Sequence, residues 1–201
     1  MRDFYESFWA HPPDADEPEP EPWEWERRRA LLLDAVEPGD RVLDLGTGAG
    51  AFLTALQQAG ADPVGVEIAE AAAERARAAT GVEVRLVAPD GTLPFAHGEF
   101  DLVWCSEVLE HVPDALALLQ EARRVLKRDG RILLTVPYHG RFQAAAVALT
   151  RFDAHFDPLG QHVRFFTRRS LATILEHAGF EDARVRPVLG RKSLAAAARR
   201  R

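Results

Sequence analysis

The sequence predicts an α/β fold, a doubly wound and mostly parallel sheet of seven strands with an antiparallel last strand. Two observations lead to this prediction. From residue 23 onward, short apolar segments alternate with amphipathic segments of helical period, which is typical of βαβ units whose sheet is covered on both faces. A glycine-rich stretch, RVLDLGTGAGAF at 41–52, then joins the first apolar segment to a helical one, as in a ligand-binding connection at the end of a parallel strand.

The first part of the chain alternates regularly between the two kinds of segment. Pro113 stands at a favourable helix start, and Asp129-Gly130 turns the chain into the next strand. Helices are predicted at 24–36, 50–59, 69–79 and 114–127, and strands at 41–45, 62–67, 82–87, 100–105 and 131–136.

After Pro137 the alternation breaks, and residues 138–166 form an insertion with a short helical stretch near 141–151. A helix at 168–178 follows, with Thr167 as its N-cap and Gly179 as its stop. A strand is predicted at 181–188. The final SLAAAARRR favours a helix by alanine propensity. Gly190, together with a sheet that needs an edge, favours a returning antiparallel strand, which is our prediction.

Three segments describe the domain organisation. Residues 1–11 form an arm whose apolar residues have a helical spacing. Residues 12–22, PPDADEPEPEP, are acidic and rich in proline, and predict an extended linker that cannot fold alone. Residues 23–201 form the main domain. The arm is either a fixed helix on the domain or a lid in which Tyr5 and Trp9 close over a pocket.

Composition excludes several classes of protein. With 201 residues, of which 47% are hydrophobic, the chain suits one domain with a sizeable core. Its longest apolar run is too short for a membrane span, and its N-terminus lacks the pattern of a signal peptide. The single cysteine, Cys105, rules out an internal disulfide and a cysteine-based metal cluster. A reducing, cytoplasmic location is expected.

The charge is unevenly distributed along the chain. The net charge is −6, but residues 1–120 hold 24 acidic and 8 basic side chains, whereas residues 121–201 hold 7 acidic and 17 basic ones. A basic C-terminal portion attracts an anionic substrate or RNA, or it consists of solvated helix faces. Both interpretations stay open.

The glycine-rich stretch indicates what kind of ligand is bound. Gly46, Gly48 and Gly50 follow the first strand, where missing side chains let the backbone approach a ligand or make a tight turn. Asp44 stands two residues before the first glycine. Its carboxylate would repel a pyrophosphate and favour an ammonium or sulfonium. The stretch therefore favours a nucleoside that carries an amino acid over NAD.

Three further segments contribute polar groups to the same edge of the sheet. Glu67 ends the second strand, where an acidic side chain accepts hydrogen bonds from ribose hydroxyls or caps the next helix. In APDGTLPF at 88–95, Asp90 can accept a hydrogen bond from an adenine amine, beside three apolar residues that offer ligand contacts. FDLVWCSEVLEHVPD at 100–114 places Ser106 and Glu107 at the mouth of the site, with Cys105 as a buried core thiol.

Together these motifs resemble the class I S-adenosylmethionine-dependent methyltransferases, in particular the small-molecule branch of the methyltransferase 11 or 23 domain type. The resemblance runs from about residue 41 to residue 199 and rests on VLDLGTGAG, VGVEIAE, DGTLPF, FDLVWCSEVLEHVPD, EARRVLKRDGRILLTVP and HVRFFTRRSLATILEHAGFE. Thr47 stands where the family often has cysteine. The resemblance implies a Rossmann-like fold, S-adenosyl-L-methionine as cofactor and S-adenosyl-L-homocysteine as product.

The resemblance also implies roles for individual residues. Asp44 would hold the methionine ammonium, Glu67 the ribose hydroxyls and Asp90 the adenine amine. The full set of cofactor-binding residues that it implies is Asp44, Gly46, Thr47, Gly48, Gly50, Glu67, Ile68, Asp90, Gly91, Ser106 and Glu107.

The acceptor must be bound outside the sheet, by the arm and the insertion. Tyr5, Trp9 and Tyr138 are candidates for substrate or lid contacts. A histidine could deprotonate an acceptor or contact it, and the candidates are His139, His155 and His162. Each could instead be a surface group or a partner of the backbone, and His111 is expected to be structural.

No metal site is predicted from the sequence. The direct displacement reaction requires no metal, and the seven histidines show no spacing typical of metal ligands. In particular, His155 and His162 lie seven residues apart in a predicted loop, which does not indicate a zinc site.

The predicted function is methyl transfer from S-adenosylmethionine to a small molecule by direct displacement, without a membrane span. The acceptor atom (O, N, S or C) and the oligomeric state stay open. The second candidate is an RNA methyltransferase of the tRNA-modifying kind, because that branch shares EARRVLKRDGRILLTV and the C-terminal portion is basic. The third is a non-catalytic module that binds S-adenosylmethionine for regulation or assembly.

Overall fold

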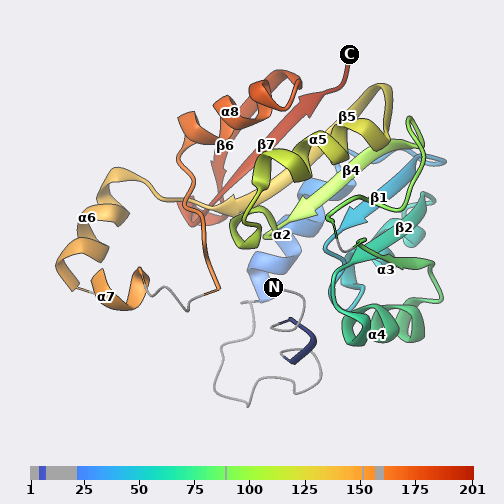
Figure 1. The fold of residues 1–201 in the computed structure, drawn as a ribbon, viewed down its shortest axis with the longest axis horizontal. Coiled ribbons are helices and arrows are strands. Elements are labelled where there is room, and N and C mark those ends of the chain that lie inside the picture. Colours follow the sequence, from blue (N-terminus) through green and yellow to red (C-terminus); the bar gives the residue numbers. More distant parts are fainter. Residues whose placement is uncertain (1–4, 8–21, 89, 151, 157–160) are drawn as a thin grey trace.

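A single sheet of seven strands organises the molecule, in the order β3-β2-β1-β4-β5-β7-β6 (Figure 1). The computed structural model describes residues 5–7, 22–88, 90–150, 152–156 and 161–201. The strands are β1 (Arg41–Leu45), β2 (Asp62–Glu67), β3 (Val84–Leu86), β4 (Phe100–Ser106), β5 (Leu126–Pro137), β6 (Glu181–Val188) and β7 (Ser193–Arg199). The first five strands are parallel, whereas β7 runs antiparallel to both β5 and β6. The predicted fold class is confirmed.

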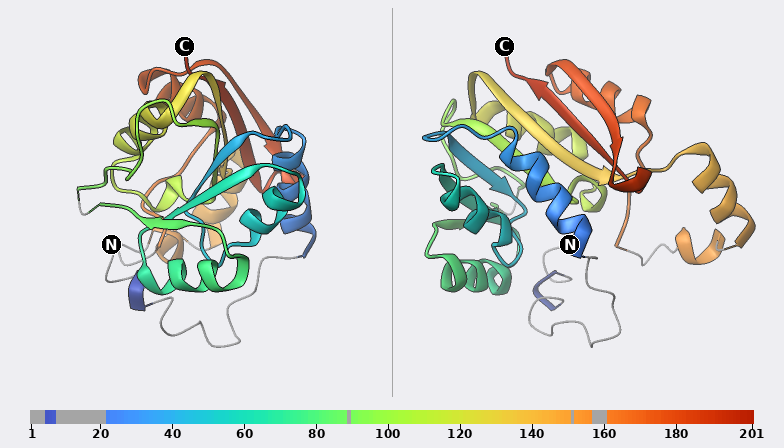
Figure 2. Two further views of the ribbon diagram at one scale, coloured as in Figure 1. Left: turned by 90° about the vertical axis from the view of Figure 1, so that its right-hand side faces the viewer. Right: turned by 180° about the vertical axis from the view of Figure 1, so that it is seen from behind.

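Helices cover both faces of this sheet (Figure 2). They are α2 (Pro22–Leu33), α3 (Ala51–Gln58), α4 (Glu70–Thr80), α5 (Ala115–Val125), α6 (Arg141–Thr150), α7 (Phe152–His155) and α8 (Arg168–His177), with the short 3-10 turns η1 (Leu109–His111) and η2 (Leu189–Arg191). Helices α6 and α7 belong to the insertion and project away from the sheet. Among the described residues, no helix combines the length and the apolar character that crossing a membrane requires.

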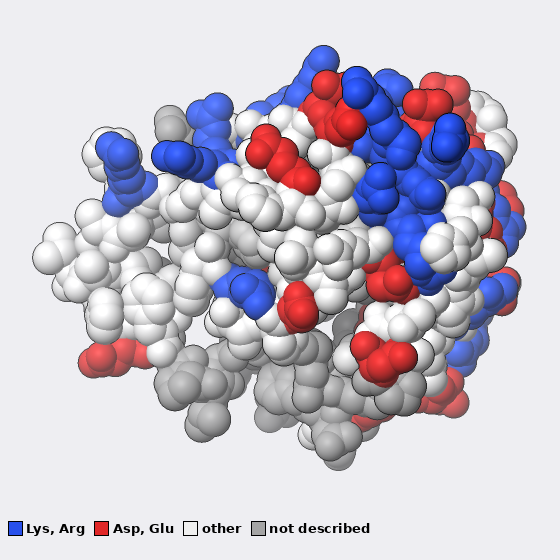
Figure 3. All heavy atoms as spheres, turned by 45° about the horizontal axis from the view of Figure 1, so that its top comes forward, with Lys and Arg blue, Asp and Glu red and all other residues white. Residues whose placement is uncertain are grey.

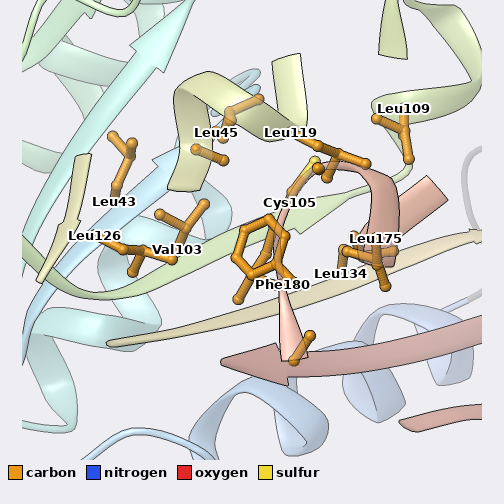
Figure 4. Packing of buried hydrophobic residues seen from close by; sticks show 14 of the residues in the cluster. Leu43, Leu45, Val103, Cys105, Leu109, Leu119, Leu126, Leu134, Leu175 and Phe180 are labelled. Atoms are coloured by element: carbon orange, nitrogen blue, oxygen red, sulfur yellow. The ribbon is translucent and has the colours of Figure 1, made fainter. Parts of the chain in front are cut away.

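The alternation of side chains along β1 divides the core between the two faces. Leu43 and Leu45 belong to a large cluster that includes Leu119 of α5 and Leu175 of α8, and Figure 4 shows part of this packing. The other face packs against α2 and α3, and its cluster consists of Leu32, Val42, Leu56, Leu102, Trp104 and Leu133. Because successive strand residues point to opposite faces, Asp44 shares the α3 face with Val42.

Cys105 lies inside the larger cluster and is 2% exposed. Burial raises the pKa of its thiol well above the ordinary range. The expectation of a buried core thiol is confirmed.

The predicted helix at 168–178 is confirmed with its cap. The Thr167 side chain accepts a hydrogen bond from Ser170 N at 3.1 Å, while Thr167 N donates to Ser170 Oγ at 2.9 Å. This reciprocal capping satisfies two amides of the first turn that have no partner inside the helix.

Strand β5 begins at Leu126, five residues earlier than predicted. Asp129 adopts a positive φ of 61°, so the chain turns at the predicted position without leaving the sheet. Asp129 N donates to Arg200 O at 2.8 Å, and Arg200 N donates to Gly130 O at 2.9 Å. Backbone pairing with the C-terminal segment therefore extends the strand through the turn.

Strand β7 confirms the returning antiparallel strand that was predicted for the alanine-rich C-terminal segment. Its alanines pair with the centre of β5, for example Ala196 with Leu134, and Ala195, Ala196 and Ala198 are buried. Pairing on both sides and close packing of small side chains outweigh the helix propensity of alanine, which is weak relative to tertiary contacts.

Enlarging one face of β7 tests this assignment. We expect Ala196→Leu to lower the free energy of unfolding by about 1–3 kcal/mol, because Ala196 is 1% exposed and a larger side chain overpacks the core. Ala197→Leu is the matched control, since Ala197 is exposed, and it should change stability by no more than about 0.5 kcal/mol. Urea denaturation measures both. Equal losses in the two variants would contradict the assignment.

Candidate functional site

The carboxyl ends of β1, β2 and β4 meet at one edge of the sheet. Parallel pairing sets Leu45 beside Val66 and Asp44 beside Trp104. The acidic residues at or next to the ends of these strands therefore converge, although they come from distant parts of the sequence. This edge is where ligands bind in open parallel sheets.

The glycine-rich connection forms a tight turn between β1 and α3. Gly46, Gly48 and Gly50 have φ values of 81°, 54° and 90°, which glycine adopts without strain. A Cβ at Gly46 would lie 2.3 Å from Val108 Cγ2, and one at Gly50 would lie 2.9 Å from Thr80 Cγ2. Two of the three glycines are therefore also required by packing within the protein, and not only by the approach of a ligand.

Asp44 is buried at this turn. It is 2% exposed, and its Oδ2 atom has no hydrogen-bond partner among the described residues. Thr47 Oγ1 donates to the Asp44 carbonyl oxygen at 2.9 Å. Burial, followed by the charge of Glu67, raises the pKa of Asp44 to about 7. A buried carboxyl oxygen without a partner favours a ligand that donates hydrogen bonds or carries positive charge.

Glu67 connects the turn to the beginning of α4. Its Oε2 accepts from Gly48 N at 2.9 Å, and its Oε1 accepts from Ile68 N at 2.7 Å and Ala69 N at 3.4 Å. A carboxylate has about four lone-pair positions, so these bonds leave capacity for a ligand. Ile68 is partly exposed beside it.

The described part of the N-terminal arm lies against this site. Glu6 accepts hydrogen bonds from the first amides of α4, Glu70 N at 2.7 Å and Ala71 N at 3.3 Å. The ring of Tyr5 packs edge-on against the His111 ring, with centroids 6.0 Å apart. Burial, Glu110 and Glu67 raise the pKa of Tyr5 to about 12. The predicted lid residue Trp9 and the predicted linker, apart from Pro22, lie outside the described residues.

The segment after β3 differs in part from the prediction. Asp90 is exposed and accepts a hydrogen bond from Thr92 N at 2.9 Å, and this bond lowers the pKa of Asp90. Gly91 beside it has a φ of 87°. The neighbouring Leu93 and Phe95 are buried in the core, where Phe95 packs against Phe100. The expectation that this apolar pair contacts a ligand is therefore wrong.

Ser106 and Glu107 follow β4 on the same edge. Ser106 Oγ lies 2.9 Å from Thr135 Oγ1, and Glu107 N donates to Thr135 O at 2.9 Å. Glu107 has a φ of 53°, an uncommon value for a residue other than glycine. Its Oε1 atom is buried without a partner among the described residues, and burial raises its pKa.

One turn further, η1 carries Glu110, which was not predicted as a site residue, and His111, which was expected to be structural. Glu110 is 1% exposed and its Oε2 has no partner among the described residues. Burial and the charge of Glu107 raise the pKa of Glu110 to about 8. His111 Nε2 lies 3.7 Å from Glu110 Oε1. The repeated acidic residues in Glu107-x-x-Glu110-His111 were the feature of the sequence that could have indicated these two residues.

The three predicted histidines of the insertion form two groups, one beside His111 and the other around Phe165. The His162 ring lies 4.9 Å from the His111 ring, whereas His139 and His155 both pack on Phe165, at 4.7 and 4.9 Å. Burial, followed by His111, lowers the pKa of His162, and burial followed by His155 lowers that of His139.

Tyr138 packs differently from the histidines. It is partly buried against the core cluster, and its ring fills the space that a side chain at Gly140 would need. The position of Tyr138 is therefore set by packing within the protein.

Comparison with known proteins agrees with this architecture. A family model described as a methyltransferase domain matches residues 21–185. The ubiquinone biosynthesis O-methyltransferase of Pseudomonas aeruginosa (strain UCBPP-PA14) is 31% identical over 160 residues, which cover 76% of this chain and 68% of that protein.

Two solved structures share the fold. A chain in the complex of the Haloferax volcanii Trm112 methyltransferase activator with a candidate methyltransferase gives a TM-score of 0.75 at 20% identity, covering 97% of this chain and 96% of that chain. The Haemonchus contortus phosphoethanolamine N-methyltransferase 2, solved with S-adenosyl-L-methionine, gives 0.68 at 16% identity, covering 88% of this chain and 52% of that chain. Since the family model spans most of its length, this chain belongs to the S-adenosylmethionine-dependent methyltransferases.

Proposed function

We propose that the protein transfers a methyl group from S-adenosylmethionine to a small-molecule acceptor at the carboxyl ends of β1, β2 and β4. The observation that supports this most strongly is Asp44, a buried carboxyl group with a partnerless oxygen beside a glycine-rich turn. Such a group suits the ammonium of the cofactor's methionine portion. The same group would oppose the pyrophosphate of a dinucleotide.

The other residues implied by the family resemblance are assigned in the same way. Glu67 has free acceptor capacity for ribose hydroxyls, and the partly exposed Ile68 offers an apolar surface for adenine. The exposed Asp90 has one carboxyl oxygen bonded to Thr92 N, and the other is assigned to the adenine amine. The remaining proposed cofactor contacts are Gly46, Thr47, Gly48, Gly50, Gly91, Ser106 and Glu107.

The bound cofactor supplies an activated methyl group and a neutral leaving group. A lone pair of the acceptor forms a bond to the methyl carbon as the carbon–sulfur bond breaks, and the acceptor loses its proton. The contribution of this chain is to hold the acceptor in line and to exclude water. His139, His155 and His162 are candidates to receive the proton or to contact the acceptor, since the insertion gathers them near η1.

The relatives support oxygen as the acceptor atom. The curated protein from Pseudomonas aeruginosa, at 31% identity, is an O-methyltransferase of ubiquinone biosynthesis. We therefore propose a small hydroxylated compound as the acceptor of this chain.

The RNA alternative is less well supported by the charge distribution. Figure 3 shows Lys and Arg side chains gathered on one part of the surface. Basic residues at the amino ends of the strands are paired with acids: Arg41 with Asp62, Lys127 with Asp101 and Arg131 with Asp40. These groups lie at the opposite edge of the sheet from the proposed site. A salt-sensitive complex with tRNA would favour the RNA alternative.

Removing the Glu67 carboxylate tests the placement of the cofactor. We expect Glu67→Ala to weaken S-adenosylhomocysteine binding about 10- to 150-fold, since hydrogen bonds to a charged group contribute about 1.5–3 kcal/mol. Stability should also fall, because three amides lose their acceptor. Glu83→Ala, which removes an exposed carboxylate of the next strand region, is the control. Calorimetric titration with an affinity within twofold of the unmodified protein would contradict the placement.

Asp44 makes stability depend on pH in the ligand-free protein. Its pKa is about 7 in the folded state against an ordinary 3.8, so its stabilising contribution is complete below pH 3.8 and is lost as the pH rises through 7. Relative to the unmodified protein, Asp44→Asn should therefore gain stability between pH 4 and pH 8, while its affinity for S-adenosylhomocysteine falls. Thermal unfolding across this range measures the effect.

Asp101→Asn is the control for this pH series. Burial alone would raise the pKa of Asp101, but hydrogen bonds from Lys127 and the Arg41 amide lower it overall. Asp101→Asn should therefore lose stability at neutral pH, the opposite sign. A pH-independent difference between Asp44→Asn and the unmodified protein would contradict the raised pKa of Asp44.

Deleting residues 1–11 distinguishes a lid from a fixed helix. We propose a lid, because the contacts of Tyr5 and Glu6 lie around the cofactor site. Deletion should then weaken S-adenosylhomocysteine binding and abolish turnover, and the ligand-free melting temperature should fall only slightly, by what the two hydrogen bonds from α4 to Glu6 contribute. A fixed helix would instead contribute roughly 1.5–3 kcal/mol for each fully buried aromatic side chain. Early melting with normal binding would overturn the lid.

A further inference from the structure

A buried threonine interrupts the apolar centre of β5. Thr135 is 0% exposed and stands between Leu134 and Val136, which are also buried. Its neighbours across the sheet are Ser106 of β4 on one side and Ala195 of β7 on the other. A buried hydroxyl without a partner is unfavourable, so the hydrogen bonds of Thr135 constrain the residues around it.

Thr135 is bonded to both residues that were predicted at the mouth of the site. Its Oγ1 lies 2.9 Å from Ser106 Oγ, and its carbonyl oxygen accepts from Glu107 N at 2.9 Å. The second bond supports the positive φ of 53° at Glu107, which is uncommon for a residue other than glycine. Thr135 therefore fixes the chain at the point where β4 ends.

The direction of the hydroxyl bonds follows from Glu107. Burial raises the pKa of its carboxyl group, whereas the charge of Arg28 and hydrogen bonds from Thr135 and Ser193 act in the opposite direction. An ionised carboxylate only accepts, so the single proton of the Thr135 hydroxyl is donated to Glu107. In the bond between Thr135 and Ser106, Thr135 Oγ1 is then the acceptor and Ser106 is the donor.

The Ser106 oxygen is thereby left as an acceptor at the edge of the sheet. A hydroxyl has one proton and two lone pairs, and the proton of the partly exposed Ser106 is used inside the protein. Asp44 pairs with Trp104, and Ser106 lies two positions further along β4, so all three side chains share one face of the sheet. Asp44 Oδ2 has no partner among the described residues. Ser106 and Asp44 thus present acceptors on the same face.

We propose that Thr135 is a positioning residue that orients the Ser106 hydroxyl, so that Ser106 Oγ accepts a hydrogen bond from the ammonium of the cofactor's methionine portion. This inference rests on the proposed function. Because Thr135 is fully buried, it acts through Ser106 and not by contact with the cofactor. An ammonium donates and never accepts, so a Ser106 hydroxyl that donated outward would oppose it.

The same arrangement discriminates between the two charged groups of an amino acid. Ser106 Oγ and the Asp44 carboxyl group favour an ammonium and oppose a carboxylate, which needs donors. The methionine portion is therefore held in one orientation. Since methyl transfer by displacement depends on alignment, a fixed orientation of this portion also fixes the direction of the methyl group.

Removing the Thr135 hydroxyl at nearly constant shape tests this role. Thr135→Val should weaken binding of S-adenosylhomocysteine about 2- to 12-fold, the effect of losing one hydrogen bond. The deamino analogue of S-adenosylhomocysteine, which has hydrogen in place of the ammonium, should bind the variant and the unmodified protein equally. Thr135→Ser keeps the hydroxyl and should restore the affinity for S-adenosylhomocysteine. Calorimetric titration measures both ligands, and circular dichroism verifies that each variant is folded.

Thr173→Val is the matched control, since Thr173 is an exposed threonine of α8, and it should leave both affinities unchanged. Equal weakening of both ligands by Thr135→Val, no weakening of either, or failure of Thr135→Ser to restore binding would overturn the positioning role. In each of these cases the unmodified protein still binds S-adenosylhomocysteine, and the proposed function stands. Absence of S-adenosylhomocysteine binding by the unmodified protein would instead contradict the proposed function.

Discussion

The parallel pairing of β1 between β2 and β4 is the constraint on which the site depends. It forces the carboxyl ends of three strands to one edge, and each strand has an acidic side chain at its end or one position away from it. Asp44, Glu67 and Glu107 are consequently crowded and withdrawn from water. Such crowding is unfavourable in the empty protein, and the clusters of apolar side chains on both faces of the sheet offset it.

This arrangement makes the proposed binding edge a source of instability that a bound ligand would relieve. Glu107 has a left-handed backbone conformation, and both Asp44 and Glu110 have oxygen atoms without partners among the described residues. Each feature costs free energy in isolation. Compounds that supply positive charge or hydrogen-bond donors would stabilise the folded state in proportion to their affinity. The proposed site therefore holds buried acidic groups that repel one another in the ligand-free protein, and these groups are complementary to ligands that carry positive charge.

Most of the sheet could be predicted because local patterns and tertiary structure agree. The strands at 62–67 and 181–188 have the predicted limits, and Thr167 caps α8 as expected. The returning strand β7 could be predicted only because the expected sheet topology was given more weight than the helix propensity of alanine. The early start of β5 could not be predicted, because it depends on pairing with Arg200, far away in the sequence.

The site was predicted less completely for a similar reason. Asp44 and Glu67 stand next to strand ends, so local sequence identifies them. His111 and His162 are 51 positions apart, and their proximity depends on the backbone bonds between Val163, Arg164 and Glu110. The periodicity of apolar residues along the sequence contains no information about a contact between residues so far apart. Burial of Leu93 and Phe95 likewise follows from the packing of a loop that has no regular pattern.

The position of β7 has a consequence for how the protein is made. It is the last strand in chain order, yet it lies inside the sheet, between β5 and β6. During synthesis on the ribosome, β5 and β6 therefore emerge before the strand that separates them. Until β7 arrives, each exposes an unpaired edge, which is a site for wrong pairing between nascent chains. Arg184 and Arg186 on β6 place charge along this edge, a feature that opposes such association.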